Sequence, residues 1–104
     1  MPIVDRSIAG AFPTVRDFTS RKALGYRQRL PFETEEKWSG ISVFNNEAQC
    51  RKNALKNAFI TPIAELTIEE DGPIAYSRTG SNGHRTVWGE PQQLLDRVTK
   101  VTPF

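Results

Sequence analysis

The densest group of chemically versatile side chains lies between residues 83 and 91, in the string Gly83-His84-Arg85-Thr86-Val87-Trp88-Gly89-Glu90-Pro91. It contains the only histidine of the chain, and the loop before it, Gly80 to Gly83, is rich in glycine. An imidazole changes charge near neutral pH, so His84 could serve as a general acid or base at a cleft. In the plainer interpretation, His84 and Trp88 only cap the core at the edge of a sheet.

We expect residues 84–88 and the loop before them to border a ligand site. Glycines let the backbone approach a guest closely, and a tryptophan offers a flat apolar wall with one N–H donor. An arginine that turns towards such a site could pair with an anion. The predicted ligand-binding residues are His84, Arg85, Trp88, Arg78 and Ser42.

Catalytic chemistry is harder to assemble from this sequence. Ser42 could act as a nucleophile only beside a base, and His84 is the sole imidazole that could serve. The chain lacks the Gly-x-Ser-x-Gly motif of a nucleophile elbow, so we assign no catalytic residue. With one cysteine, Cys50, and one histidine, the chain cannot form an internal disulfide or a Cys/His zinc site. We expect no metal and no cofactor.

Positive charge is concentrated near the N-terminus. The whole chain has a net charge of only +2, but residues 1–31 hold six cations against two anions, a local net of +4. Three aromatic residues, Phe12, Phe18 and Tyr26, are interleaved with these cations and Phe32 follows them, a pattern typical of single-stranded nucleic-acid binding and equally of a solvated surface beside a core. We favour the second interpretation and expect no nucleic-acid binding. A protein partner or a small anionic ligand remains open.

Length and composition fit one globular domain. The chain has 104 residues, of which 38% are apolar and 25% charged. Its apolar runs are far shorter than the ~20 residues needed to cross a bilayer, and its N-terminus does not resemble a signal peptide. We therefore expect a cytoplasmic protein that does not enter a membrane.

A strand–helix–strand unit between residues 40 and 68 is predicted to organise the fold. Its parts are a strand at Ile41–Phe44, a helix from Asn46 to about Ala58 and an extended segment at Ile60–Ile68. Asn46 and Gln49 have the spacing of a capping box, which supports the start of the helix. The helix should turn Ala54, Leu55 and Ala58 inward and keep its cations in solvent.

The rest of the chain adds shorter elements. We expect a strand at Ile3–Val4, a short helix or ordered loop between Val15 and Leu30, and a helical turn at Glu33–Lys37. Strands at residues 74–78 and 84–88 follow, and Pro91 begins a second helix with Leu94, Leu95 and Val98 on its apolar stripe. These elements predict an α+β fold with a mostly antiparallel sheet of four to five short strands and two helices on one face. Residues 1–104 form one domain, with a basic, partly irregular lead-in over 1–37 and the core over 38–104.

Several segments resemble a group of small bacterial proteins of unknown function. They are Gly40-Ile41-Ser42-Val43-Phe44, Ala54, Ile63-Ala64-Glu65-Leu66, Gly83-His84-Arg85-Thr86-Val87-Trp88-Gly89 and Leu94-Leu95, within residues 38–101. The order of elements is also similar to the C-terminal half of ADP-ribosyltransferase-like domains. That resemblance implies NAD chemistry, with His84, Ser42 and Glu90 as the counterparts of the family's residues. Their order along this chain departs from the family's usual pattern unless Arg16 or Arg29 takes the first role.

The leading functional hypothesis is a non-catalytic, cytoplasmic binding or interaction module. Catalysis usually needs two or three convergent polar groups of matched pKa, and this chain offers few of them. The competing hypothesis is a small NAD- or RNA-directed enzyme that uses His84, Ser42 and an N-terminal arginine. A pocket that holds Ser42, His84 and an arginine together would favour the enzyme.

Overall fold

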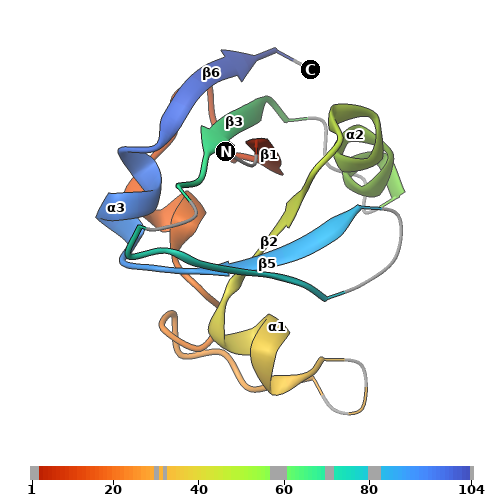
Figure 1. The fold of residues 1–104 in the computed structure, drawn as a ribbon. Coiled ribbons are helices and arrows are strands. Elements are labelled where there is room, and N and C mark those ends of the chain that lie inside the picture. Colours follow the sequence, from red (N-terminus) through yellow and green to blue (C-terminus); the bar gives the residue numbers. More distant parts are fainter. Residues whose placement is uncertain are drawn as a thin grey trace.

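A computed structural model describes residues 3–29, 31, 33–56, 61–69, 72–79 and 83–103. Six strands form one sheet in the order β4-β5-β2-β1-β3-β6, and every neighbouring pair is antiparallel (Figure 1). The strands are β1 (Ile3–Ser7), β2 (Ile41–Phe44), β3 (Ile63–Thr67), β4 (Ala75–Arg78), β5 (His84–Trp88) and β6 (Val98–Thr102). The helices are the 3₁₀ helix η1 (Val15–Phe18) and the α-helices α1 (Glu35–Ser39), α2 (Glu47–Lys56) and α3 (Pro91–Leu95).

The α+β class and the mostly antiparallel sheet are confirmed, but the sheet has six strands rather than four to five. All five strands predicted from the sequence are present, and the sixth comes from the C-terminal end of the chain. The first strand extends to Ser7 and lies between β2 and β3, and the C-terminal tail forms the edge strand β6. Short polar strands of this kind carry little apolar alternation, so their length is set by the neighbours with which they pair.

The two faces of the sheet carry separate apolar clusters. Val4 lies opposite Leu66, and Ile41 lies opposite Val87, so these side chains share one face with the main core. On the other face, Phe44 and Ile63 pack against Cys50 of α2. The fold is therefore two layers of packing separated by one sheet.

The helices are divided between these faces, which differs from the expectation of two helices on one face. The α2 helix lies beside β1 and β2, whereas α3 lies next to η1 (Figure 1). Phe18 of η1 and Leu94 of α3 are 1% exposed and complete the main core, and Leu95 is partly buried against it. Leu66 of β3 is 0% exposed and belongs to the same core.

The α2 helix matches its sequence signals at the start and departs from them on its inner face. The Asn46 side chain accepts a hydrogen bond from the Gln49 backbone N–H at 3.1 Å, which confirms the predicted cap. Ala54 is buried as expected, but Leu55 is 56% exposed, so its predicted inward orientation is wrong. Cys50, one turn before Ala54, takes the inner position instead, because residues four apart share a helix face. Ala58 lies outside the described residues.

The α1 helix is seated against the sheet through Gly40. Thr34 caps its N-terminus by accepting a hydrogen bond from the Lys37 backbone N–H at 3.3 Å. A Cβ atom at Gly40 would overlap the Thr86 methyl group and the Val87 carbonyl oxygen, so only glycine lets α1 pass directly into β2 at this distance from β5. This close approach places the Ser39 hydroxyl 3.2 Å from the Trp88 indole nitrogen at the end of β5. In the described part of the chain, no helix is long and apolar enough to span a membrane.

Candidate anion-binding site

The residues that the sequence nominated as a ligand site are divided between the two faces of the sheet. Ser42 lies opposite Thr86, and Phe44 lies opposite His84, so Ser42 and His84 share a face two positions apart. Trp88 lies on that face as well, by strand alternation. Arg78 and Arg85 lie opposite each other and share the other face. The geometry therefore does not gather the five residues at one place.

His84 is engaged by its neighbours rather than by Ser42. Its Nδ1 lies 3.0 Å from the Thr79 hydroxyl, and its ring meets the edge of Phe44 with centroids 5.3 Å apart. Burial lowers the pKa of His84, and the nearby cations Lys37 and Arg85 lower it further. The imidazole is therefore neutral at neutral pH. No hydrogen bond joins it to Ser42, and the cavities that Ser42 lines do not include His84.

Arg85 and Trp88 are also held by local contacts. Arg85 donates from Nε to the Tyr76 hydroxyl at 3.2 Å and from its terminal nitrogen to the His84 carbonyl at 3.0 Å. The Trp88 indole N–H donates to the Ser39 hydroxyl at 3.2 Å. Trp88 also lines a small cavity of about 180 Å³. Residues 80–82 of the neighbouring glycine-rich loop lie outside the described residues. Whether this strand binds a guest stays a prediction.

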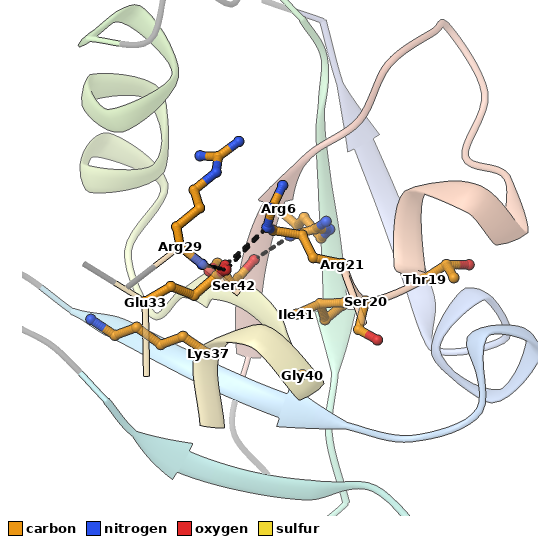
Figure 2. A pocket seen from close by; sticks show the side chains of 10 residues that line it. All are labelled: Arg6, Thr19, Ser20, Arg21, Arg29, Glu33, Lys37, Gly40, Ile41 and Ser42. Carbon is orange, nitrogen blue, oxygen red and sulfur yellow. Dashed lines mark hydrogen bonds and ion pairs between the residues drawn. The ribbon is translucent and has the colours of Figure 1, made fainter. Parts of the chain in front are cut away.

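A different site forms where the basic N-terminal segment meets β2 and α1. Two adjoining cavities of about 270 Å³ and 520 Å³ share the walls formed by Arg6, Thr19, Arg21 and Ser42. Figure 2 shows Arg6 and Arg21 beside Ser42, with Arg29 and Lys37 extending outward from the smaller cavity. We call these two cavities together the basic cleft.

Arg6 occupies the junction of the basic cleft. Its Nε donates to the Asp17 carbonyl and a terminal nitrogen donates to the Ser42 carbonyl, both at 2.6 Å. Among the described residues, no carboxylate lies within ion-pair distance of this guanidinium. Burial lowers the pKa of Arg6, and the charge of Asp17 opposes that shift. The described residues therefore hold this partly buried positive charge with neutral carbonyl acceptors and supply no direct counter-ion.

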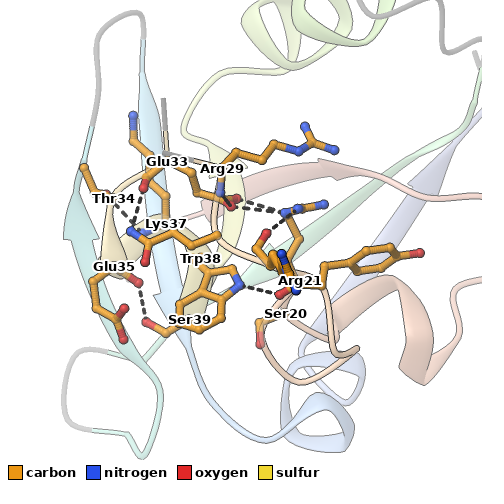
Figure 3. A network of polar contacts seen from close by, with 12 residues as sticks. Ser20, Arg21, Arg29, Glu33, Thr34, Glu35, Lys37, Trp38 and Ser39 are labelled. Atoms are coloured by element: carbon orange, nitrogen blue, oxygen red, sulfur yellow. Dashed lines mark hydrogen bonds and ion pairs between the residues drawn. The ribbon is translucent and has the colours of Figure 1, made fainter. Parts of the chain in front are cut away.

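Glu33 fixes the second arginine of the basic cleft. Its carboxylate pairs with Arg21 Nε at 3.0 Å and accepts the Arg29 backbone N–H at 3.0 Å (Figure 3). A terminal nitrogen of Arg21 also donates to the Arg27 carbonyl at 3.0 Å. The turn at residues 21–25 ends at Gly25, whose φ of 86° suits glycine. Glu33 thus orders the loop and neutralises Arg21 while leaving the Arg29 side chain outside the ion pair.

The charge balance of the basic cleft remains positive. Its walls carry five cations and two carboxylates: Arg6, Arg16, Arg21, Arg29 and Lys37 against Asp17 and Glu33. Glu33 is paired with Arg21, and the Asp17 carboxylate accepts the backbone N–H groups of Ala9 and Thr14 at 2.9 and 2.8 Å. Within the described residues, no hydrogen bond or ion pair engages the side-chain nitrogens of Arg29 or Lys37. The basic cleft can therefore attract and hold an anion.

Of the five predicted ligand-binding residues, only Ser42 lines the basic cleft; Arg16 and Arg29, which the resemblance offered as alternatives, line it too, whereas Arg6, Arg21 and Lys37 were not predicted there. The signal was present in the six cations of residues 1–31, but position along the chain does not show which of them converge. Arg6 reaches Ser42 across 36 residues of sequence, and Lys37 comes from an element outside that segment. Only the pairing of β1 beside β2 brings them together.

The described residues contain no group of three or more His, Cys, Asp or Glu side chains arranged to hold a metal ion. Comparison of the chain with protein-family models, curated proteins and solved structures finds no match. The resemblances noted from the sequence therefore stay predictions, and function has to be argued from the geometry of the basic cleft.

Proposed function

We propose that this protein is a non-catalytic binding module whose ligand is a small anion, held in the basic cleft. The observation that supports the proposal best is the Arg6 guanidinium, which is partly buried and lacks a carboxylate partner among the described residues. An anion entering the cleft would supply the missing counter-charge. Guanidinium groups are suited to this task because their fixed N–H geometry matches carboxylate and phosphate oxygens.

Three further cations of the basic cleft would contribute to anion binding in different ways. Arg21 is held in place by Glu33 and forms a fixed wall, whereas Arg29 and Lys37 lie at the rim with their charges unpaired within the described residues. Rim charges chiefly speed the encounter with an anion, and a fixed inner charge governs how long it stays. The Ser42 hydroxyl could add one neutral hydrogen bond at the same wall.

No specific contact favours the alternative enzyme that would use Ser42, His84 and an N-terminal arginine. Ser42 lies with Arg6 and Arg21, but the only imidazole of the chain is bound to Thr79 and packed on Phe44. Ser42 therefore lacks an adjacent base. The cytoplasmic location expected from the sequence stays a prediction.

An NMR titration of the backbone amides with inorganic phosphate and pyrophosphate tests the proposal. We expect shifts to cluster on residues 19–21, 29 and 40–42, which border the basic cleft. Shifts clustered on residues 78–90 would instead place the ligand at the His84–Trp88 strand. The absence of any saturable shift at low ionic strength would contradict an anion site.

A further inference from the structure

The larger cavity of the basic cleft has a wall that an inorganic anion would not use. Besides its polar residues, the cavity of about 520 Å³ is lined by apolar side chains: Ile8, Ala9, Leu24, Phe44, Cys50 and Ala54. Its volume is within the range of roughly 300–1,000 Å³ found for pockets that enclose small organic ligands. Phe44, Cys50 and Ala54 are firmly buried, so this wall is part of the packed structure rather than a loose surface.

The two cavities differ in their apolar surface. The smaller cavity holds Arg29, Glu33 and Lys37, and the larger one combines the aliphatic and aromatic wall with Arg16 and Asp17. Arg6 and Arg21 line both, so they lie where the two environments meet. A molecule that filled both cavities would place its charge at this junction and an apolar group beyond it.

We propose that the ligand of the basic cleft is an anionic amphiphile, with a phosphate or carboxylate head on Arg6 and Arg21 and a compact apolar body in the larger cavity. This inference rests on the proposed anion-binding function and adds the nature of the organic body. Removal of that body from water against Leu24, Phe44 and Ala54 supplies affinity that the charged head alone cannot. The head in turn fixes which end of the molecule enters first.

Calorimetric titrations with inorganic phosphate, phenyl phosphate, octyl phosphate and octanoate test the inference. We expect phenyl or octyl phosphate to bind at least about tenfold more tightly than inorganic phosphate, because each buried methylene contributes roughly fourfold. The comparison of octyl phosphate with octanoate shows which head the junction prefers. Adenosine monophosphate serves as a phosphate whose body carries many polar atoms.

Matched variants locate the apolar body. Leu24→Asn should lower the ratio of phenyl phosphate affinity to inorganic phosphate affinity at least about fivefold, whereas Leu55→Asn, on the exposed side of α2, should leave that ratio unchanged. If Leu24→Asn fails to fold, Ala9→Trp offers a second variant, since Ala9 is exposed and lines the same cavity. Ala9→Trp should lower octyl phosphate affinity by narrowing the space for its chain.

The outcomes separate the two proposals. Equal affinities for inorganic, phenyl and octyl phosphate would overturn the amphiphile and leave the anion site standing. Tightest binding of adenosine monophosphate, insensitive to Leu24→Asn, would also overturn it in favour of a nucleotide. Binding of none of the compounds would overturn the anion site itself.

Discussion

Asp5 and Arg6 are consecutive residues of β1 with opposite charges, and their side chains lie in different surroundings on the two faces of the sheet. The Arg6 guanidinium donates to two carbonyl oxygens and lines both cavities of the basic cleft. The Asp5 side chain, on the other face, is 7% exposed and has no hydrogen bond or ion pair among the described residues. Glu65, directly opposite Asp5 on β3, and Glu47 add like charge.

Arg6 keeps its charge and can bind an anion, whereas burial favours the uncharged form of Asp5. Burial, followed by the charges of Glu65 and Glu47, raises the pKa of Asp5 to about 6. A proton can therefore neutralise Asp5 in mildly acidic solution, whereas an arginine keeps its charge and needs an anion. Carbonyl oxygens orient the Arg6 guanidinium without neutralising its charge, and this hydrogen-bond donor borders the open space of the basic cleft, whose walls do not include Asp5.

The largest expected effect concerns the apolar packing on the Arg6 face. Leu66 lies opposite Val4 in the main core and is 0% exposed, so Leu66→Ala should lower the free energy of unfolding by ~2–5 kcal/mol. Leu55→Ala, at a position 56% exposed, should change it by less than ~0.5 kcal/mol. Urea denaturation measures both. Midpoints that shift equally would show that the assignment of the main core is wrong.

Asp5→Asn should stabilise the protein above pH 3.8, increasingly up to about pH 6 and fully above it. The unfolded chain releases this proton near pH 3.8 and the folded protein near 6, so stability falls as the pH rises between these values. Replacing the carboxyl group should raise the free energy of unfolding by up to about 3 kcal/mol at pH 7, at 1.36 kcal/mol per pKa unit. Below pH 3.8 the two proteins should be equally stable.

Denaturant titrations across this pH range measure the effect. Glu69→Gln removes an exposed carboxylate from the same chain and serves as the control. A stabilisation of Asp5→Asn that did not depend on pH would contradict the account of Asp5.

Arg6→Gln should destabilise the protein, in contrast to Asp5→Asn. It removes two charge-assisted hydrogen bonds to the carbonyls of Asp17 and Ser42, which should cost about 1–3 kcal/mol of stability. It should also abolish phosphate binding, since the inner charge of the basic cleft is lost. Thermal unfolding with and without phosphate separates the two effects. A variant that is less stable but binds phosphate normally would make Arg6 a purely structural connection between β1, β2 and η1.

The smallest expected effect is the binding of nucleic acid. We predict no complex with short RNA at physiological salt, because the positive charge converges on a cleft rather than along an extended track. Fluorescence anisotropy between low and physiological salt tests this. A micromolar, salt-sensitive complex that Arg27→Ala and Arg29→Ala abolish would overturn the ranking of partners.

The sequence predicted the fold better than the site because strands leave a local signature. The strands predicted at Ile41–Phe44 and His84–Trp88 match β2 and β5 at both ends, and β3 lies within the extended segment predicted at Ile60–Ile68. The first strand was predicted shorter, since Asp5 and Arg6 break the apolar pattern with two charges. These two charged residues are consecutive on β1, so one lies on each face of the sheet and the apolar alternation is interrupted on both faces.

The basic cleft could not be predicted because its residues converge only through long-range pairing. Arg6, Arg21 and Lys37 come from β1, a turn and α1, and no fixed spacing relates them. The composition of the string around His84 predicts a ligand site, yet its side chains alternate across β5 and divide between the two faces of the sheet. Ser42 was selected as a partner for His84, and in the structure its nearest charged neighbour is Arg6.

The central claim is that anion binding depends on where the cations lie and not on their number. The double variant Arg29→Gln/Lys37→Gln removes two rim charges of the basic cleft, and Arg27→Gln/Lys52→Gln removes two exposed cations that do not line it. Calorimetric affinities for pyrophosphate compare them at equal net charge. We predict about a tenfold loss in the first double variant and less than about a twofold loss in the second. Equal losses in both would show that the anion responds only to the overall charge of the protein, and would contradict a site in the basic cleft.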